Sequence, residues 1–406
     1  MKNNFLLGLA IFAVMLNSCS SDDTADIIIT DNSTTNNTTN NSTDGGTGEP
    51  DDTSIAIAAA TYSSDLNLLE NKTYTIDGPV IMSSGTTLVI GKGVTIKAAA
   101  TGADVYVAIS QGANIIANGT ADAPIVMTSS ASSPQAGDWG GLIVLGSAPI
   151  NSVTGTATST SEIASLPYGG TNAADDSGIL RYVRVEYSGG AADGQSENNG
   201  FSFYGVGNGT TVEYIQAFEG KDDGIEFFGG TVNVDYVSVI NAQDDSIDWT
   251  EGYSGMITNA YVKHGAEHDK GIEADGYNTD IGNNSSPIFW SKPTLTNVTI
   301  IGVGNTEGTE AVRLRAGTQG IFNNILINGF EEGFDLDGDA GADSANPTGT
   351  GVLNGDLKIT DVTFENVTVK VKNDTGETFA DSVLISGDGN GTGTNYATWG
   401  SGWTRN

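Results

Sequence analysis

A segment that repeats at an interval of 22 residues most constrains how this chain can fold. Residues 212–225 (VEYIQAFEGKDDGI) align without a gap with residues 234–247 (VDYVSVINAQDDSI). Related segments begin at Ile257, Leu295, Ile321 and Ile359, so the steps between starts are 22, 23, 38, 26 and 38 residues. Repeats of this length with alternating apolar residues are typical of a solenoid, in which each repeat buries its apolar face against its neighbours.

The alternation within each repeat predicts one coil of a parallel β-helix, because alternate residues of a strand point to the same side. Successive coils place at a first inward position Ile215, Val237, Ala260, Val298 and Val362. A second inward position holds Ala217, Val239, Val262, Ile300, Leu326 and Phe364. A neighbouring corner position holds Asn259, Asn297, Asn323 and Asp361, which we interpret as structural because asparagine bonds readily to nearby backbone.

The coil region is predicted to span residues 55–406. The two long steps contain insertions, near residues 277–293 and 339–356. A solenoid has open ends that need covering, and we expect caps at residues 55–80 and in the tail from Asn373.

Several segments resemble one group of bacterial surface proteins. They are Thr86–Lys97, Ala117–Thr128, Gly137–Gly146, Asp223–Asn233 and Gly271–Asp275. The resemblance covers roughly residues 70–406. It implies an all-β fold, a single-stranded right-handed parallel β-helix of the pectin-lyase-like kind. It implies no particular activity, because β-helices serve as lyases, hydrolases, adhesins and phage spikes.

The N-terminal residues predict export and a lipid anchor. The apolar run Phe5–Leu16 is too short to span a bilayer, which indicates a signal peptide over residues 1–18. It ends in LNSC, which resembles a bacterial lipobox, so Cys19 is the expected lipidation site. The following SSDD resembles the export signal of Bacteroidetes surface lipoproteins. Residues 19–54, rich in Asn, Thr, Ser and Asp, are expected to form a disordered tether.

Localisation and partners follow from these features and from composition. We expect a cell-surface lipoprotein of the outer membrane, with a periplasm-facing position as the alternative. Membrane lipid, a glycan and an outer-membrane protein are the expected partners. The chain has 16 Lys+Arg and 50 Asp+Glu, a net charge of −34, which excludes nucleic acid. One cysteine excludes a disulfide framework and cysteine-based zinc modules.

One face of the predicted coils carries a column of charged side chains. The second strand of each coil places at one outward position Glu226, Asp248, Glu273, Arg313 and Asp335. Neighbouring coils lie about 4.8 Å apart, so three carboxylates follow one another directly, which is unfavourable for like charges. The preceding turns add further acidic residues to the same patch, among them Asp223, Asp245 and Asp269.

Three interpretations of this patch stay open. It binds a divalent cation, with Ca²⁺ as the expected cofactor and Asp223, Glu226, Asp245, Asp248, Asp269 and Glu273 as its ligands. Alternatively, a carboxyl with a raised pKa acts as a general acid, with Asp245, Asp248 and Arg313 as catalytic candidates. The third interpretation is a well-hydrated surface without a ligand.

Two groups of β-helix enzymes offer a comparison for this patch. Asp244-Asp245 resembles the aspartate pair of polygalacturonases. The segments Lys263–Gly265 and Arg313–Arg315 match the other motifs of that group only in part, so we do not carry the activity over. Pectate lyases use carboxylate-bound Ca²⁺ and an arginine base, which Arg313 or Arg315 beside the patch fits loosely.

Aromatic residues near the patch favour a sugar ligand. Phe228, Tyr253, Tyr277 and Trp290 are candidates for stacking on a sugar ring, whereas Trp249 is predicted to point inward. The alternative is that the insertion aromatics pack the insertion onto the coil. The two histidines, His264 and His268, are expected in a turn or on the surface.

These observations favour a glycan-binding module for nutrient capture. A polysaccharide lyase or glycoside hydrolase acting at the same acidic face is the first alternative. A structural surface protein or adhesin is the second.

Overall fold

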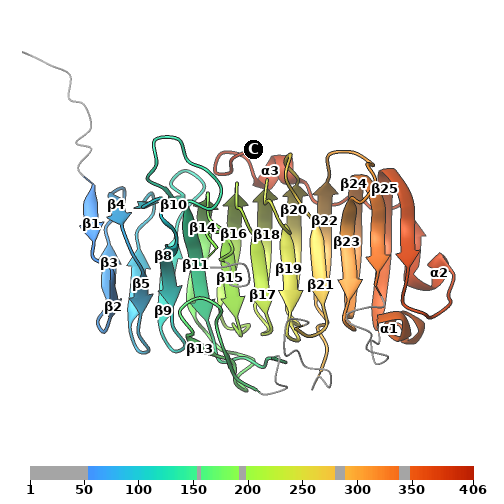
Figure 1. Ribbon diagram of the computed structural model, residues 1–406, viewed down its shortest axis with the longest axis horizontal. Coiled ribbons are helices and arrows are strands. Elements are labelled where there is room, and N and C mark those ends of the chain that lie inside the picture. Colours follow the sequence, from blue (N-terminus) through green and yellow to red (C-terminus); the bar gives the residue numbers. More distant parts are fainter. Residues whose placement is uncertain (1–53, 153–156, 192–197, 279–288, 338–347) are drawn as a thin grey trace, which may run out of the picture. The chain divides into compact units, whose positions relative to one another are not determined.

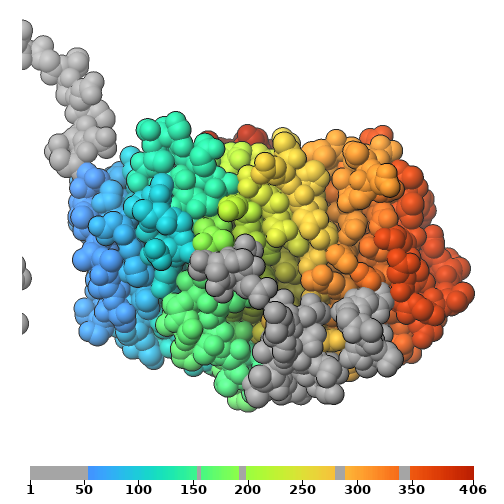
Figure 2. All heavy atoms as spheres, viewed as in Figure 1, coloured from blue at the N-terminus to red at the C-terminus, as the bar shows by residue number. Residues whose placement is uncertain are grey.

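Twenty-four strands stack in one continuous sheet that winds along the chain in sequence order. The computed structural model describes residues 54–152, 157–191, 198–278, 289–337 and 348–406. The predicted signal peptide and Cys19, nearly all of the tether, most of the first insertion and half of the second lie outside these residues. The described strands confirm the all-β, right-handed parallel β-helix (Figure 1). In the space-filling view, the colours succeed one another along the long axis, as stacked coils require (Figure 2).

The N-terminal coils contain three short strands each. β1 (Ile55–Ile57) pairs with the first coil, which consists of β2 (Ala60–Tyr62), β3 (Leu66–Leu68) and β4 (Thr73–Ile76). The next coil holds β5 (Val80–Met82), β6 (Thr87–Ile90) and β7 (Thr95–Ala98), and the third holds β8 (Gly102–Ile109), β9 (Asn114–Asn118) and β10 (Ile125–Ser129). Each strand pairs in parallel with its counterpart one coil later. Residues 55–80 are therefore coil strands, and the prediction of a separate N-terminal cap is wrong.

From β11 (Trp139–Leu145) onward, each coil contains one long and one short strand. The long strands are β14 (Gly178–Glu186), β16 (Thr211–Phe218), β18 (Asn233–Ile240), β20 (Met256–Lys263) and β22 (Thr294–Ile301). The short strands are β15 (Phe201–Tyr204), β17 (Ile225–Phe228), β19 (Ile247–Thr250), β21 (Ile272–Asp275) and β23 (Glu310–Arg315). In the last coils the two strands join as β24 (Gly320–Leu336) and β25 (Leu357–Asn373), which are followed by β26 (Ile385–Asp388).

A few elements lie outside the coils. β12 (Ser159–Thr160) and β13 (Pro167–Tyr168) form a small antiparallel pair. Three short helices are α1 (Thr348–Asn354), α2 (Asp381–Leu384) and α3 (Tyr396–Trp399). No helix among the described residues is long and apolar enough to cross a membrane.

The apolar interior follows the predicted inward columns, with one correction. Ile215, Val237, Ala260, Val298 and Val362 occupy equivalent positions, and all are buried. In β24, however, Ile327 rather than Leu326 is the buried residue of the second column. The reason is a register one residue later than predicted: Phe322 points inward opposite Leu295, and Ile321 lies half-buried on the outside.

The column of corner residues is shifted by one residue in β24 as well. Asn324, not Asn323, continues the column of Asn259 and Asn297, and each member has a left-handed backbone, with φ between 56° and 58°. The Nδ2 atom of Asn297 donates to Asn259 Oδ1 at 3.0 Å, and that of Asn324 donates to Asn297 Oδ1 at 2.8 Å. Asparagine suits this corner because it tolerates the left-handed region and its amide bonds to the next rung.

The C-terminal tail does not simply cap the end of the solenoid. The part with α2 and β26 lies at the end, where β26 pairs with β25 (Figure 1). Residues 389–406, here called the C-terminal strap, return along the outer side of the long strands. Trp403 contacts Tyr182 and Tyr214 edge-on, with ring centroids 5.5 and 6.2 Å apart. The C-terminal part of the predicted cap is thus a lateral strap.

Candidate functional site

The predicted column of charged residues is present on the short strands, and its members lie opposite one another as predicted. Glu226 lies opposite Asp248, Asp248 opposite Glu273, Glu273 opposite Arg313, and Arg313 opposite Asp335. Their neighbours along the strands, Phe227 and Trp249 among them, are buried in the interior. Because side chains alternate, burial of these apolar neighbours fixes the charged side chains on the outer side of the short strands.

Three of the predicted ligands converge on one point. A carboxylate oxygen from each of Asp223, Glu226 and Asp248, here called the carboxylate cluster, lies within 4.8 Å of the other two. Asp223 comes from the turn before β17 and accepts a hydrogen bond from the backbone N–H of Asp245 at 2.9 Å. Glu226 accepts one from Asn199 Nδ2 at 2.6 Å. These bonds orient two of the carboxyls toward the third.

The counter-charge on the carboxylate cluster is weak, because Arg315, which is paired with Glu273 and Asp275, offsets only part of the rise in the pKa of Asp248. Among the described residues, no lysine, arginine or histidine forms an ion pair with its members. Oδ1 of Asp248 is buried and has no hydrogen-bond partner. Burial raises the pKa of all three carboxyls well above the usual range. Repulsion by neighbouring carboxylates raises it further, chiefly by Asp222 at Asp223, by Asp248 at Glu226 and by Glu273 at Asp248. At an effective dielectric of 20, two charges 4.8 Å apart repel by about 3.5 kcal/mol.

Glu273 has a different environment, although it was predicted as a ligand of the same site. It forms ion pairs with Arg315 and, at 3.3 Å, with Lys270. Arg313 Nη1 is 3.8 Å away, and the same guanidinium donates from Nη2 to Asp337 at 2.6 Å. Glu273 is thus neutralised by basic side chains and belongs to no group of convergent carboxylates within the described residues. Arg313, a catalytic candidate, is held by Asp337.

A second group of acidic residues flanks the carboxylate cluster. Asp244, Asp245 and Asp269 also bring three carboxylate oxygens within 4.8 Å of one another. Asp245 Oδ1 accepts from the backbone N–H of Lys270 at 2.7 Å, and Lys270 Nζ forms an ion pair with Asp269. Asp269 is exposed, so this group forms the solvent side of the patch.

Three of the four aromatic candidates are unavailable to a ligand. Phe228 points outward as predicted but is 2% exposed, because its ring stacks on Tyr204 with centroids 3.9 Å apart beneath Ile163 and Tyr168. Tyr253 is fully buried, stacks on Phe227 at 4.3 Å, and donates its hydroxyl to Val232 O. The structure therefore corrects the predicted aromatic platform.

Tyr277 and Trp290 flank the insertion, whose residues 279–288 lie outside the described part. Tyr277 is 3% exposed and so offers no ring face either. Trp290 is half-buried, and its Nε1 is buried without a partner. Trp290 is thus the single aromatic candidate with accessible surface. Trp249 is fully buried and points inward, as predicted.

The two histidines lie together in the turn after β20, where His264 is buried and His268 half-buried. His264 is 4% exposed, and its ring centroid is 4.6 Å from that of His268 and 5.2 Å from that of Phe330. Burial first, and the neighbouring His268 second, lower the pKa of His264 to about 4. His264 thus lies in a turn, which was one of the two expected positions, but not on the surface, because its ring packs against Phe330.

The sequence interpretation missed two features of this face. Asn199, which orients Glu226, comes from an earlier coil than the aligned repeats. Glu310, Glu332 and Asp335 bring three carboxylate oxygens within 4.8 Å, with Lys372 Nζ 3.4 Å from both Glu332 and Asp335. Asp335 belongs to the predicted column, and extending the column of turn residues one coil earlier and two coils later would have found Asn199, Glu310 and Glu332.

Comparison with known proteins supports the fold. A family model described as a pectate-lyase-like β-helix domain matches residues 60–404. No curated protein matches the chain. Two solved structures of the catalytic domain of a GH87 α-1,3-glucanase in complex with nigerose, one of them a single-residue variant, are 12% identical, with a TM-score of 0.30. Each comparison covers 83% of this chain and 64% of that catalytic domain. This distant likeness carries no information about what the present chain binds.

Proposed function

The chain belongs to the family of pectate-lyase-like β-helix domains, and from that premise we propose that it binds a divalent cation at the carboxylate cluster and holds a glycan there. The observation that carries this proposal is the unpartnered, buried Oδ1 of Asp248 beside Asp223 and Glu226. Three adjacent carboxyls either keep protons at neutral pH or take up a cation that cancels their repulsion.

Calcium is the cation that this donor set fits. Ca²⁺ prefers six to eight oxygen ligands in flexible arrangements, and carboxylates supply most of them in proteins. Asp223, Glu226 and Asp248 would supply the first oxygens. Asp245, whose backbone N–H donates to Asp223, would supply a further carboxylate oxygen. The bound ion would supply positive charge to which sugar hydroxyl or carboxylate oxygens can bind. Trp290, which is half-buried beside the insertion, would contribute a ring face.

A thermal unfolding experiment tests the cation site. The protein is stripped with EDTA and then given millimolar Ca²⁺. We expect a rise of several degrees in Tm, because a ligand at 100 times its Kd adds about 2.7 kcal/mol to the free energy of unfolding. Asp248→Asn should abolish this rise. Asp77→Asn, which alters an exposed carboxylate in the N-terminal coils, should preserve it. A Tm unaffected by Ca²⁺ in the unmodified chain would remove the proposal.

Glycan binding is tested separately on polysaccharides immobilised with and without Ca²⁺. Binding that requires Ca²⁺ and is lost in Asp248→Asn supports the proposed role. A Ca²⁺-induced rise in Tm without binding of any acidic or neutral polysaccharide would reduce the cation to a structural function.

We place this activity at the cell surface through a lipid on Cys19. The lipobox-like LNSC and the acidic residues that follow it support this localisation. Labelling with a radioactive fatty acid should mark the unmodified protein and not Cys19→Ala. Protease accessibility on intact cells then distinguishes the outer face from the periplasm-facing alternative.

A glycoside hydrolase is the second candidate, favoured by the same geometry. Two carboxyls about 5–5.5 Å apart are typical of retaining enzymes, and the cluster oxygens lie within 4.8 Å of one another. The raised pKa of Asp248 suits a general acid, with Asp223 or Glu226 as its partner. New reducing ends from a polysaccharide, lost in Asp248→Asn and formed equally in EDTA, would favour the hydrolase over the binding module.

A further inference from the structure

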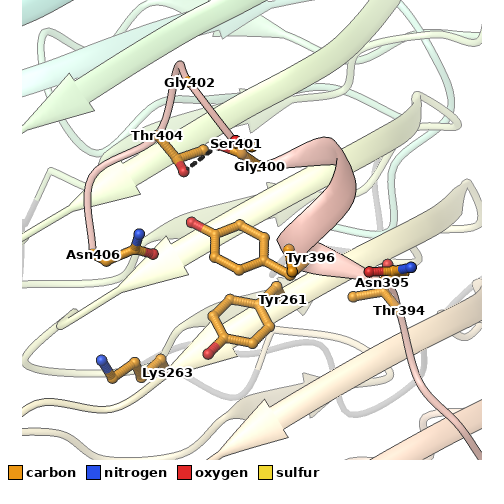
Figure 3. Close-up of a pocket in the computed structure, with 11 residues that line it drawn as sticks. Tyr261, Lys263, Thr394, Asn395, Tyr396, Gly400, Ser401, Gly402, Thr404 and Asn406 are labelled. Atoms are coloured by element: carbon orange, nitrogen blue, oxygen red, sulfur yellow. Dashed lines mark hydrogen bonds between the residues drawn. The ribbon is translucent and has the colours of Figure 1, made fainter.

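A pocket of about 680 Å³ lies between β20 and the C-terminal strap (Figure 3). The strand contributes Tyr261 and Lys263, and the strap contributes Tyr396, Ser401, Thr404 and Asn406, among others. This pocket lies on the sheet of long strands, whereas the carboxylate cluster belongs to the short strands. The two sites are therefore separate.

Lys263 distinguishes this pocket electrostatically. All five arginines of the chain form ion pairs with carboxylates, and so do Lys92, Lys270, Lys292, Lys370 and Lys372. Lys263 is half-buried and forms none within the described residues, and no aspartate or glutamate side chain is among the residues that line the pocket. An unpaired ammonium in a chain of net charge −34 is available to an anionic ligand.

The polar groups around Lys263 suit a polyhydroxylated molecule. The rings of Tyr261 and Tyr396 stack with centroids 4.0 Å apart and planes 3° from parallel. Figure 3 shows both hydroxyls on the side where the Lys263 ammonium and the Asn406 amide lie. The Tyr396 hydroxyl accepts a hydrogen bond from Ser238 at 3.2 Å, which leaves its own proton to donate. These groups can both donate to and accept from sugar hydroxyls.

The strap is held firmly enough to define the pocket. Arg405 exchanges two backbone hydrogen bonds with the Gln216 side chain, at 2.7 and 2.8 Å. Trp399 Nε1 donates to Thr394 Oγ1 at 2.9 Å, and Thr404 Oγ1 donates to Gly400 O at 2.6 Å. The Gln216 bonds fix the strap to β16, and the other two hold the strap's own turn in shape. The pocket wall is therefore pre-organised, which lowers the entropy cost of binding.

We propose that this strap pocket binds an acidic sugar, a uronate, with Lys263 pairing its carboxylate and the two tyrosines and Asn406 bonding its hydroxyls. No cation takes part. The inference goes beyond the proposed function, because it adds a second saccharide site with opposite electrostatics on another sheet.

Ligand-observed NMR on the purified chain in EDTA tests the proposal with D-galacturonate and its neutral counterpart D-galactose. Galacturonate should bind more tightly than galactose. Lys263→Met, which keeps the aliphatic stem, should weaken galacturonate binding about tenfold, equivalent to about 1.4 kcal/mol. Lys358→Met, which removes an exposed ammonium outside the pocket, should leave binding unchanged.

Three results would overturn the proposal. The first is no galacturonate binding at millimolar concentrations. The second is equal affinity for the two sugars with no effect of Lys263→Met. The third is binding that appears only with Ca²⁺, which would assign the ligand to the carboxylate cluster. Because the decisive measurement is made in EDTA, failure of the strap pocket leaves the proposed cation site untouched, and the converse also holds.

Discussion

Asp223, Glu226 and Asp248 point away from the apolar interior, yet each is buried enough for its pKa to rise well above the usual range. The cause is first desolvation and then repulsion among neighbouring carboxyls. Elsewhere on the same face the chain supplies Lys270, Arg313 and Arg315 to the carboxylates. The three cluster residues therefore favour either protons or a cation over bare negative charge.

This competition predicts an unusual dependence of stability on pH. The folded-state pKa of these carboxyls is higher than the unfolded value, so the folded state binds more protons, and the stability they contribute is lost as the pH rises through the folded pKa. In EDTA, Tm should increase as the pH falls from about 8 to about 5. Saturating Ca²⁺ should flatten or reverse this slope, because the ion competes with protons. A Tm slope that is identical with and without Ca²⁺ would contradict the cation site.

His264 should act in the opposite direction. Its pKa is lowered to about 4, so between about 6.5 and 4 the unfolded state binds more protons, and stability is lost as the pH falls through that window. The full loss is about 3 kcal/mol. In EDTA, chemical denaturation at several pH values should show this loss as a difference between variants: relative to His264→Leu, the unmodified chain and His268→Gln should lose this free energy of unfolding as the pH falls from about 6.5 to about 4. Equal pH profiles of His264→Leu and the unmodified chain would contradict it.

The sequence predicted which residues of the site share a column, but not which of them are accessible. Alternation correctly placed Glu226, Asp248 and Phe228 on the outside of the coil. Whether an outward side chain meets solvent depends on segments far away in the sequence. Tyr168 and Ile163, which cover Phe228, belong to a segment with no repeat pattern, so the burial of this aromatic could not be inferred.

At the scale of elements, the ladder of corner asparagines links four successive coils. Asp235, Asn259, Asn297 and Asn324 are joined by side-chain hydrogen bonds of 2.8 to 3.0 Å. The sequence identified this column but misplaced one member by a residue. Ile321 and Phe322 are both apolar, so local alternation fits either register, and only pairing with β22 selects Phe322 as the inward residue.

Substitutions of Asn297 separate the contribution of its side-chain hydrogen bonds to stability from the contribution of its left-handed backbone. Asn297→Ala removes hydrogen bonds to both neighbours and places a Cβ-bearing residue at φ 57°, where the left-handed backbone costs about 1–2 kcal/mol. Asn297→Gly removes the same bonds without that penalty. Denaturant titration should therefore rank the free energies of unfolding as unmodified, then Gly, then Ala. If Gly and Ala were equally destabilising, the backbone would contribute nothing at this corner.

At the scale of the whole molecule, the C-terminal strap joins coils that lie far apart in the sequence. Contacts between coils are between near neighbours, and their period can be read from the sequence. The strap instead joins Trp403 to Tyr182 and Tyr214, about 200 residues earlier. The tyrosines stack on one another with centroids 4.4 and 4.2 Å apart from Tyr182 to Tyr236. Nothing in the repeat pattern specifies which segment covers these stacked tyrosines.

Trp403→Ala should release the strap without unfolding the coils. Trp403 is 1% exposed, and truncating a buried tryptophan costs about 3–5 kcal/mol when the structure around it persists. The strap has few other buried apolar residues, so opening the strap locally requires less free energy than leaving a cavity in an intact structure. We expect faster hydrogen exchange and proteolysis within residues 389–406, little change in the Tm of the coils, and loss of galacturonate binding with the pocket wall. Trp399→Ala, at a half-buried position, is the matched control and should give smaller effects. A large fall in Tm without local opening would instead show that the strap and the coils unfold as one cooperative unit.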